Sequence, residues 1–234
     1  MREMIAFVPA RSGSKRLKDK NQLKIEGISL IRRTLLLLCE GSFTHVVLSS
    51  DSKEYFNEAK GLNVHCDLRP LELSHDDALT SDLLVEWLER SKISKEAIIF
   101  LWQVTSPFRS DELVRDFVDR ARLLKHGEML MCVSKLSKVS EINDEGVTRP
   151  IDYSFGVRSQ DVKSNLVKEN GLGYAITMKT LLLERDLFPP RVISFPTNSY
   201  CLDLDIDDEI DFNIAKILLE NGIQNRETLR RTKS

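Results

Sequence analysis

The chain has 234 residues, of which 41% are apolar and 30% charged, a composition typical of a soluble globular protein with one ordinary core. Its 34 basic and 36 acidic side chains give a net charge of −2, which argues against a nucleic-acid-binding protein. The four cysteines form no Cys-x-x-Cys pair, so we expect neither a zinc site nor a disulfide framework.

The start of the chain shows no secretory signal. Met1-Arg2-Glu3 leads directly into an apolar run that is far too short to cross a bilayer. Each cysteine lies in an apolar or strand-like run, as buried thiols do in a reducing compartment. We therefore expect a cytoplasmic protein without membrane contact.

The first predicted strand, residues 4–8, leads into a turn rich in small residues and cations. Pro9 ends the strand because it has no N–H group to donate. Backbone amides can approach an anion closely at the small residues Ala10, Ser12, Gly13 and Ser14. Residues 11–20 also hold five cations: Arg11, Lys15, Arg16, Lys18 and Lys20. The turn indicates a site for the phosphates of a nucleoside triphosphate, although a solvated basic loop would also account for the charges.

The following part of the chain alternates between strand-like and helical patterns. Apolar, β-branched runs predict strands at 44–51, 62–66, 97–102 and 128–134. Helical periodicity predicts helices at 28–39, 52–60, 82–90 and 111–125, and Thr80 or Ser81 is expected to cap the third of them. Such alternation builds a parallel sheet, whose ligand lies beyond the carboxyl ends of the strands. Those ends are residues 10–20, 50–51 and 103–109.

The alternation stops after residue 134. Residues 135–168 are polar and lack a sustained period, which favours a flexible insertion or an arm that reaches a partner chain. The regular pattern then resumes with a strand at 171–176, a helix at 178–186, an extended piece at 192–195 and a helix from Asp207 or Asp208 to Glu220. We expect one domain over residues 1–222, with an irregular insertion or dimerisation arm around 135–170 and a polar tail at 223–234.

An acidic stretch precedes the last helix. Alternation of Asp203, Asp205 and Asp207 would put three carboxylates on one side of an extended segment. Like charges crowd unfavourably unless a cation neutralises them, and Mg²⁺ typically takes one or two carboxylates together with substrate phosphates. We predict that Asp205 and Asp207 bind magnesium and assign no role to Asp203. The alternative is that Asp207 or Asp208 caps the last helix.

The two charged stretches resemble motifs of a known enzyme family. Pro9-Ala10-Arg11-x-Gly13-Ser14-Lys15, followed by Lys20-Asn21, is similar to the signature of sugar-activating cytidylyltransferases, and most like that of the acylneuraminate (CMP-sialic acid) synthetases. The family often has Gly and Pro where residues 16–18 are Arg-Leu-Lys here. Asp205-Ile206-Asp207 with Asp211 resembles the family's Asp-Ile-Asp-x-x-x-Asp motif, whose first two aspartates hold magnesium. The resemblance implies an α/β fold, a Rossmann-like three-layer sandwich with a mostly parallel central sheet, like that of nucleotide-diphospho-sugar transferases.

Shorter matches imply roles for single residues. Arg69 in Arg69-Pro70-x-Glu72-Leu73 would reach the nucleotide, although a lone arginine more often forms a surface ion pair, and Thr80 would contact the base. Gln103 in Gln103-x-Thr105-Ser106-Pro107-x-Arg109 would fix the acceptor sugar or simply cap a strand end. Three further residues match sugar-contacting positions, Tyr174 being almost equally suited to the core: Lys138, Arg158 and Tyr174. The four histidines match nothing catalytic, and we expect them to be structural.

The implied activity is transfer of CMP from CTP to the anomeric hydroxyl of a nonulosonic acid, with release of pyrophosphate. The nucleotide would contact Ala10, Arg11, Ser12, Gly13, Ser14, Lys15, Lys20, Asn21, Arg69 and Thr80. Arg11, Lys20 and Asp207 would be catalytic, Mg²⁺ would be the cofactor, and a homodimer is expected. Sialic, legionaminic, pseudaminic and Kdo-like acids all stay open as acceptors. The rival interpretations are an inactive nucleotide-binding regulatory protein and a GT-A-type glycosyltransferase, of which the latter would not explain residues 11–21.

Overall fold

A seven-stranded sheet forms the centre of the computed structural model, which describes residues 2–75, 77–197 and 199–223. The strands of this sheet are β1 (Met4–Pro9), β4 (His45–Ser50), β5 (His65–Leu68), β6 (Ile98–Leu101), β7 (Glu128–Lys135), β10 (Val167–Thr177) and β11 (Arg191–Thr197). Their order across the sheet is β11-β7-β10-β6-β1-β4-β5. Residues 224–234, nearly all of the predicted polar tail, lie outside the described residues.

The sheet is mostly parallel, as predicted. β1 pairs in parallel with β4 and β6, β4 with β5, and β7 with β11. β10 runs antiparallel to both of its neighbours, β6 and β7. β10 is antiparallel to β7 because the arm between them brings the chain back without the crossover that a parallel pair requires.

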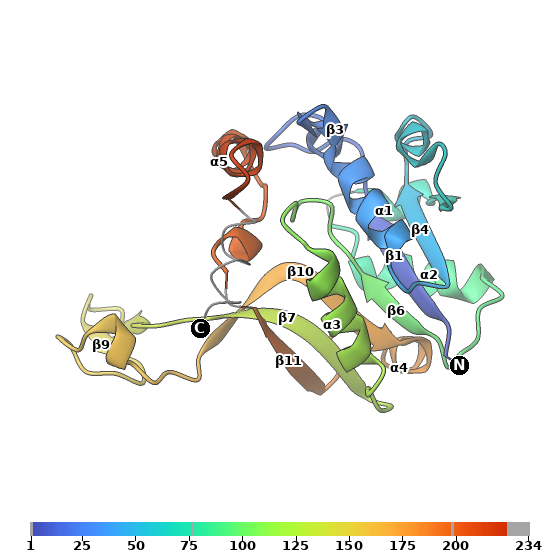
Figure 1. Cartoon of the computed structure of the whole chain (residues 1–234). Helices are drawn as coiled ribbons and strands as arrows, with labels where there is room; N and C mark the ends of the chain where they lie inside the picture. The colour runs from blue at the N-terminus through green and yellow to red at the C-terminus, as the bar shows by residue number, and fades with distance from the viewer. Residues whose placement is uncertain (1, 76, 198, 224–234) are drawn as a thin grey trace.

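Helices cover both faces of the sheet (Figure 1). Residues of α1 (Leu30–Glu40) and α3 (Asp111–Ala121) share one core with the sheet, and residues of α2 (Thr80–Arg90) and α4 (Met178–Glu184) share the other. Successive strand residues point to opposite faces, so Ala6 and Val8 of β1 join the first core while Ile5 and Phe7 join the second. The predicted three-layer α/β sandwich is confirmed.

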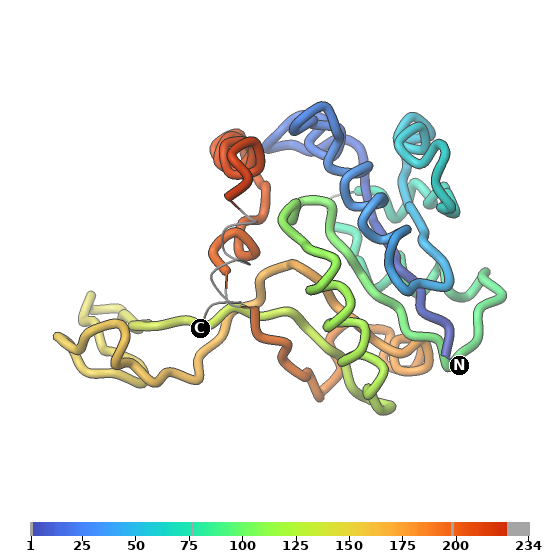
Figure 2. Tube along the Cα trace, in the orientation of Figure 1, coloured from blue at the N-terminus to red at the C-terminus, as the bar shows by residue number. Residues whose placement is uncertain are grey.

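The C-terminal part of the chain returns to the N-terminal part (Figure 2). α5 (Glu209–Glu220) lies beside the short strand β2 (Lys24–Ile25), which pairs with β3 (Ile28–Ser29). The acidic stretch before α5 therefore comes to the same side of the molecule as the cation-rich turn.

Several predicted boundaries were wrong for local reasons. The predicted helix 52–60 is a 3₁₀ helix at Tyr55–Ala59, and the next strand begins only at His65 because Leu62 and Val64 donate to turn hydrogen bonds. Neither Thr80 nor Ser81 caps α2, since Thr80 is already its first residue. The last helix is capped as the alternative interpretation proposed: Asp208 accepts from the Asp211 amide, and Asp211 accepts in return from the Asp208 amide.

The predicted row of three carboxylates does not form. Asp203 belongs to a 3₁₀ helix, Cys201–Asp203, instead of an extended segment. Its carboxylate accepts a hydrogen bond from the Ser134 hydroxyl on β7. The acidic stretch therefore divides, and Asp205 and Asp207 remain as the pair to consider for a metal.

Residues 136–166 form an arm that projects from the main body (Figure 1). The arm contains a hairpin of β8 (Ser140–Ile142) and β9 (Thr148–Pro150) and a 3₁₀ turn at Ser159–Asp161, so it is more regular than predicted. β10 begins at Val167, earlier than the predicted 171, because Val167 pairs with Lys135 at the base of the arm.

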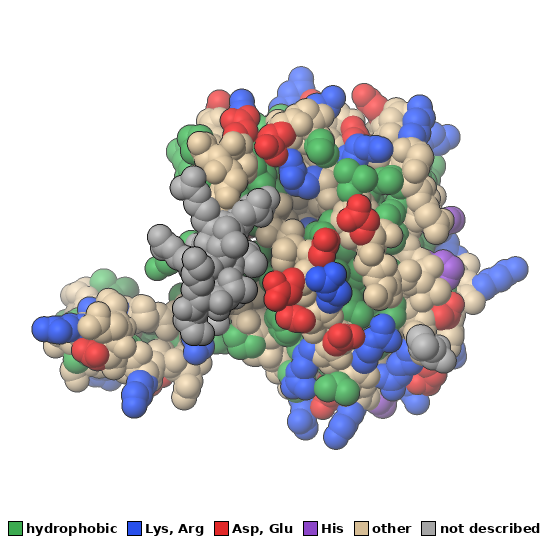
Figure 3. All heavy atoms as spheres, in the orientation of Figure 1, with side chains coloured by type: hydrophobic (Ala, Val, Ile, Leu, Met, Phe, Trp, Pro, Cys, Tyr) green, Lys and Arg blue, Asp and Glu red, His purple; other side chains and the backbone are tan. Residues whose placement is uncertain are grey.

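The surface agrees with the balanced charge of the sequence. Over the face of the main body that Figure 3 shows, acidic and basic side chains are intermixed. In the part of the chain that the structure describes, no helix has both the length and the apolar character needed to cross a membrane.

Candidate active site

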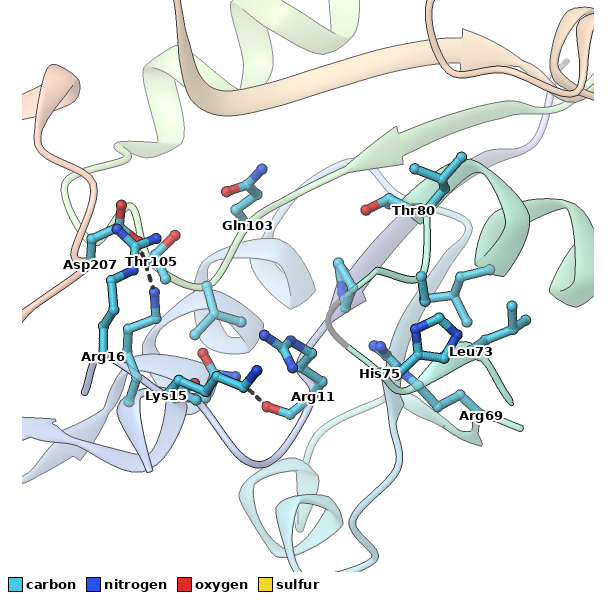
Figure 4. Close-up of a pocket in the computed structure, with 18 of the residues that line it drawn as sticks. Arg11, Lys15, Arg16, Arg69, Leu73, His75, Thr80, Gln103, Thr105 and Asp207 are labelled. Carbon is cyan, nitrogen blue, oxygen red and sulfur yellow. Dashed lines mark hydrogen bonds and ion pairs between the residues drawn. The ribbon is translucent and has the colours of Figure 1, made fainter. Parts of the chain in front are cut away.

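A cavity of about 520 Å³ opens at the carboxyl ends of β1 and β6. One end is formed by the cation loop, which we define as residues 10–21, together with Asp207. The other end is formed by residues of the segment 69–83 that include Arg69, Leu73 and Thr80. Figure 4 shows Lys15, Arg16 and Asp207 on one side of Arg11, and Arg69, His75 and Thr80 on the other.

Three groups of hydrogen bonds set the shape of the cation loop. The Ala10 amide donates to the Ser49 carbonyl at 2.9 Å, so the loop leaves β1 in register with β4. The Ser12 amide and hydroxyl both donate to Asp51, at 2.7 and 2.6 Å. Asn21 Nδ2 donates to the Arg11 carbonyl at 2.9 Å. These contacts close the loop on itself and on the end of β4.

The loop residues divide into two groups. Of the loop residues predicted to contact the nucleotide, five line the cavity: Arg11, Ser14, Lys15, Lys20 and Asn21; Arg16 and Leu17 line it as well. Ala10, Ser12 and Gly13 lie outside the lining and shape the loop instead. Gly13 has a φ of +72°, which only glycine adopts readily.

Asp207 joins the loop from the other end of the chain. Its Oδ1 lies 3.2 Å from Lys20 Nζ and 3.1 Å from Arg16 Nη2. The Asp207 amide donates to Asp211 Oδ2 at 3.0 Å, which holds Asp207 in the turn before α5. The sequence did not predict a role for Arg16, because the resembled family often lacks a cation at this position. Its place among the five cations of residues 11–20 was the one feature that could have indicated it.

Asp205 carries a buried oxygen that suits a cation. Within the described residues, its Oδ1 is buried and has no hydrogen-bond partner. Such an atom is costly unless a ligand satisfies it. No group of three or more His, Cys, Asp or Glu side chains placed to hold a metal occurs among the described residues, but Mg²⁺ needs only one or two carboxylates beside phosphate oxygens. Asp207 lines the cavity and Asp205 lies outside its lining, so magnesium binding by this pair stays a prediction.

A buried arginine stands behind this region. Arg109 Nε donates to the Leu172 carbonyl at 3.0 Å, Nη2 donates to the Gln103 carbonyl, and the guanidinium lies 5.5 Å from the centre of the Trp102 ring. Burial lowers the pKa of Arg109 to about 10, while the charge of Asp205 acts in the opposite direction. Arg109 therefore donates to two backbone carbonyls, one just after β6 and one on β10, and its charge interacts with that of Asp205.

The other end of the cavity combines one cation with apolar walls. Arg69 is buried, and its Nη2 donates to the Ser49 carbonyl at 2.8 Å, so the surface ion-pair alternative was wrong. Burial lowers the pKa of Arg69, an effect that Asp51 and Asp67 oppose and Arg11 adds to. The walls around it come from Leu73, Ala78, Leu79, Leu83 and Leu101. His75 also lines this end, which the sequence gave no reason to expect beyond its proximity to Arg69.

The four predicted sugar-contacting residues do not come together in the chain described here. Gln103 lines the cavity, and an ideal Cβ on Gly171 would stand 3.6 Å from its Oε1. Tyr174 is buried on β10, where its hydroxyl donates to Glu169 and its ring packs edge-on against Phe188. Lys138 and Arg158 are exposed on the arm, and neither lines the cavity. The sugar-binding roles of all four residues stay predictions.

Comparison with known proteins defines the class. A family model described as Cytidylyltransferase matches residues 5–224, so the chain belongs to the cytidylyltransferase family. Among solved structures, a CMP:2-keto-3-deoxy-manno-octonic acid synthetase in complex with CTP superposes with a TM-score of 0.69 at 15% identity, covering 94% of this chain and 99% of that one. A 4-diphosphocytidyl-2C-methyl-D-erythritol synthase from Anaerococcus prevotii gives a TM-score of 0.66 at 14% identity, with 94% and 99% coverage. At these identities the likeness shows the fold alone.

Relatives that match this chain more closely in sequence are named as specific enzymes. The chain is 28% identical over 233 residues to an N-acylneuraminate cytidylyltransferase of Streptococcus agalactiae, covering 95% of this chain and 55% of that protein. It is 28% identical over 243 residues to the enzyme of that name from Escherichia coli, with 96% and 56% coverage. It therefore spans about half the length of these two relatives. A CMP-N,N'-diacetyllegionaminic acid synthase of Legionella pneumophila is 26% identical over 226 residues and is matched over 96% of its length.

Proposed function

We propose that the protein transfers CMP from CTP to a nonulosonic acid and releases pyrophosphate. The observation that carries this proposal is the meeting of Arg11, Lys15 and Lys20 with Asp207 on one cavity. The negative charges of a triphosphate need cations and amides on one side and a metal on the other; this cavity offers the cations, and Asp207 offers a carboxylate that would help to hold the metal. The family and the names of the relatives that it matches support the same reaction.

The two ends of the cavity suggest how CTP lies. The triphosphate would face Arg11, Ser14, Lys15 and Lys20, whose charges and loop amides match its oxygens. The cytosine would occupy the apolar end, where Leu73 and Leu83 offer packing and Thr80 offers a hydroxyl. Arg69 donates to the Ser49 carbonyl and lies near the charges of Asp51 and Asp67, so its guanidinium is held in place before the nucleotide arrives.

Asp205 and Asp207 would hold the magnesium ion, which when bound withdraws charge from the phosphates and orients the attacking hydroxyl. The Asp205 oxygen without a partner supports this assignment. Asp207 accepts from Lys20 and Arg16 through the same oxygen, so these cations fix the orientation of its carboxylate.

The chemical step is an in-line displacement at the α-phosphorus. The anomeric oxygen of the acceptor forms the new bond to phosphorus as the bond to pyrophosphate breaks, and Asp207 is our candidate to take the hydroxyl proton. Arg11 and Lys20 stabilise the charge that develops on the α-phosphate and on the leaving pyrophosphate. Positioning supplies much of the remaining rate, because few covalent roles are left to the protein.

The acceptor would lie near Gln103, whose amide faces the cavity. Arg158 suits the carboxylate of a nonulosonic acid because a guanidinium forms paired hydrogen bonds with it. It stands with Lys138 on the projecting arm, so we propose a homodimer in which an arm reaches a partner's acceptor. Tyr174 stays a prediction, since its hydroxyl already donates to Glu169. The cytoplasmic location likewise stays a prediction.

A pyrophosphate-release assay tests the proposal. The full chain is incubated with CTP, Mg²⁺ and a panel of sialic, legionaminic, pseudaminic and Kdo-like acids, and the nucleotide sugar is detected in parallel. We expect one pyrophosphate per CMP-sugar with at least one acid. Binding of CTP without turnover on any acid would favour the regulatory protein, and consumption of a supplied CMP-sugar would favour the glycosyltransferase.

A further inference from the structure

A carboxylate outside the cavity holds the cation loop. Asp51 follows β4, and its Oδ1 accepts the Ser12 amide at 2.7 Å while its Oδ2 accepts the Ser12 hydroxyl at 2.6 Å. Both carboxylate oxygens of Asp51 therefore accept hydrogen bonds from Ser12. Hydrogen bonds to an ionised acceptor are stronger than those between neutral groups. The contact joins residues that are 39 positions apart in the sequence.

The contact also changes what Ser12 can do. A loop amide that donates to Asp51 is directed away from a bound phosphate, and Ser12 does not line the cavity. Its neighbours Arg11 and Ser14 do line the cavity. Ser12 is thus the point where the loop is fixed, and the residues beside it face the ligand.

Such fixing matters because the loop brings like charges together. Arg11, Lys15, Arg16 and Lys20 line one cavity with a single aspartate, Asp207, among its lining residues, so the mutual repulsion of the cations favours a more open loop. Gly13, with its positive φ, adds conformational freedom next to Ser12. A tether that orders the loop beforehand lowers the cost of ordering it on binding.

We propose that Asp51 is a positioning residue that holds the cation loop, through Ser12, in the shape that binds the triphosphate. The proposal rests on the function proposed above, because it concerns the same nucleotide site. It also accounts for the small residue at position 12, whose hydroxyl and amide both reach Asp51. The negative charge of Asp51 has a second effect, since it lies near Arg69 and supports that buried cation electrostatically.

Calorimetric titration of the full chain with CTP and Mg²⁺, without acceptor, tests the proposal. We expect Asp51→Ala to weaken CTP binding about tenfold or more, and Ser12→Ala about threefold. The double variant should bind like Asp51→Ala alone, because the two residues act through one contact. Asp51→Asn should recover part of the affinity, since its amide oxygen still accepts the Ser12 amide. Asp119→Ala is the matched control, an exposed aspartate on α3 that should bind CTP as wild type does.

Steady-state kinetics separates positioning from general damage. Loss of the tether should raise KM for CTP by a similar factor and leave KM for the acceptor within about twofold. Unchanged CTP affinity in both Asp51→Ala and Ser12→Ala would overturn the proposal, as would additive losses in the double variant. Should Asp51→Ala fail to fold, Asp51→Asn and Ser12→Ala carry the same test. Failure of the wild-type chain to bind CTP would instead overturn the proposed function.

Discussion

Lys20 Nζ lies 3.2 Å from Asp207 Oδ1, although 187 positions separate the two residues in the sequence. Lys20 belongs to a loop that follows the first strand, and Asp207 precedes the last helix. The fold brings them together because β1 occupies an inner position in the sheet and α5 returns beside β2. The two charged stretches that stood out in the sequence therefore face one cavity.

Removing the Lys20 charge should impair the chemical step. Lys20→Ala takes away a cation that we propose stabilises charge on the phosphates, so we expect kcat/KM for CTP to fall about 10²-fold. Initial rates of pyrophosphate release measure the effect. Lys18→Ala is the matched control, because Lys18 belongs to the same loop but is exposed and lies outside the cavity lining. Equal rates for the two variants would remove Lys20 from the mechanism.

Asp205→Asn should weaken the dependence on magnesium. The substitution keeps the shape of the side chain but removes the charge that would hold the ion, so half-maximal activity should require about tenfold more Mg²⁺ or greater. A magnesium titration at saturating CTP measures this shift. Glu209→Gln provides the comparison, because Glu209 is an exposed acid in the same stretch. A Mg²⁺ profile that matches wild type would count against Asp205 as a ligand.

The fold class and the charged stretches followed from the sequence because they depend on local patterns. Apolar runs predicted the strands, and the charged runs at 10–21 and 202–211 predicted which residues would form the functional site. The direction of β10 did not follow, since it depends on how the arm returns and no local pattern records that. The tether between Ser12 and Asp51 is also non-local, although Asp51 was already placed at the correct strand end. The position of Asp203 was wrong because its partner, Ser134, lies on β7, 69 positions earlier in the sequence.

Gly173 should be essential for packing behind the cavity. An ideal Cβ at this position would stand 2.6 Å from Cζ3 of the buried Trp102 ring, whose face also carries Arg109. We expect Gly173→Ala to lower the free energy of unfolding by about 2 kcal/mol or more, because neither ring nor strand can shift freely. Urea denaturation measures the loss. Gly41→Ala, whose nearest contacts are 3.3 Å, should cost clearly less, and similar losses would contradict the account.

The pKa of Asp51 predicts a pH dependence of stability. Burial alone would raise this pKa, but the hydrogen bonds from Ser12 and the nearby Arg69 lower it below the ordinary 3.8. A carboxyl with a lowered folded-state pKa stabilises the protein above its unfolded pKa, and this contribution is lost as the pH falls through the folded value. The difference in unfolding free energy between wild type and Asp51→Asn should thus be constant from about pH 5 to 7 and shrink below about pH 4. A difference that grows on acidification would show the opposite sign.

The central claim is that the cation loop and the aspartates before α5 bind the same triphosphate. A crystal structure of the protein with CTP and Mg²⁺ tests this claim most directly. We predict phosphate oxygens in contact with Arg11, Lys15 and Lys20, and a metal ion that bridges them to Asp205 and Asp207. A triphosphate bound elsewhere, or a metal ion that touches neither aspartate, would contradict the account.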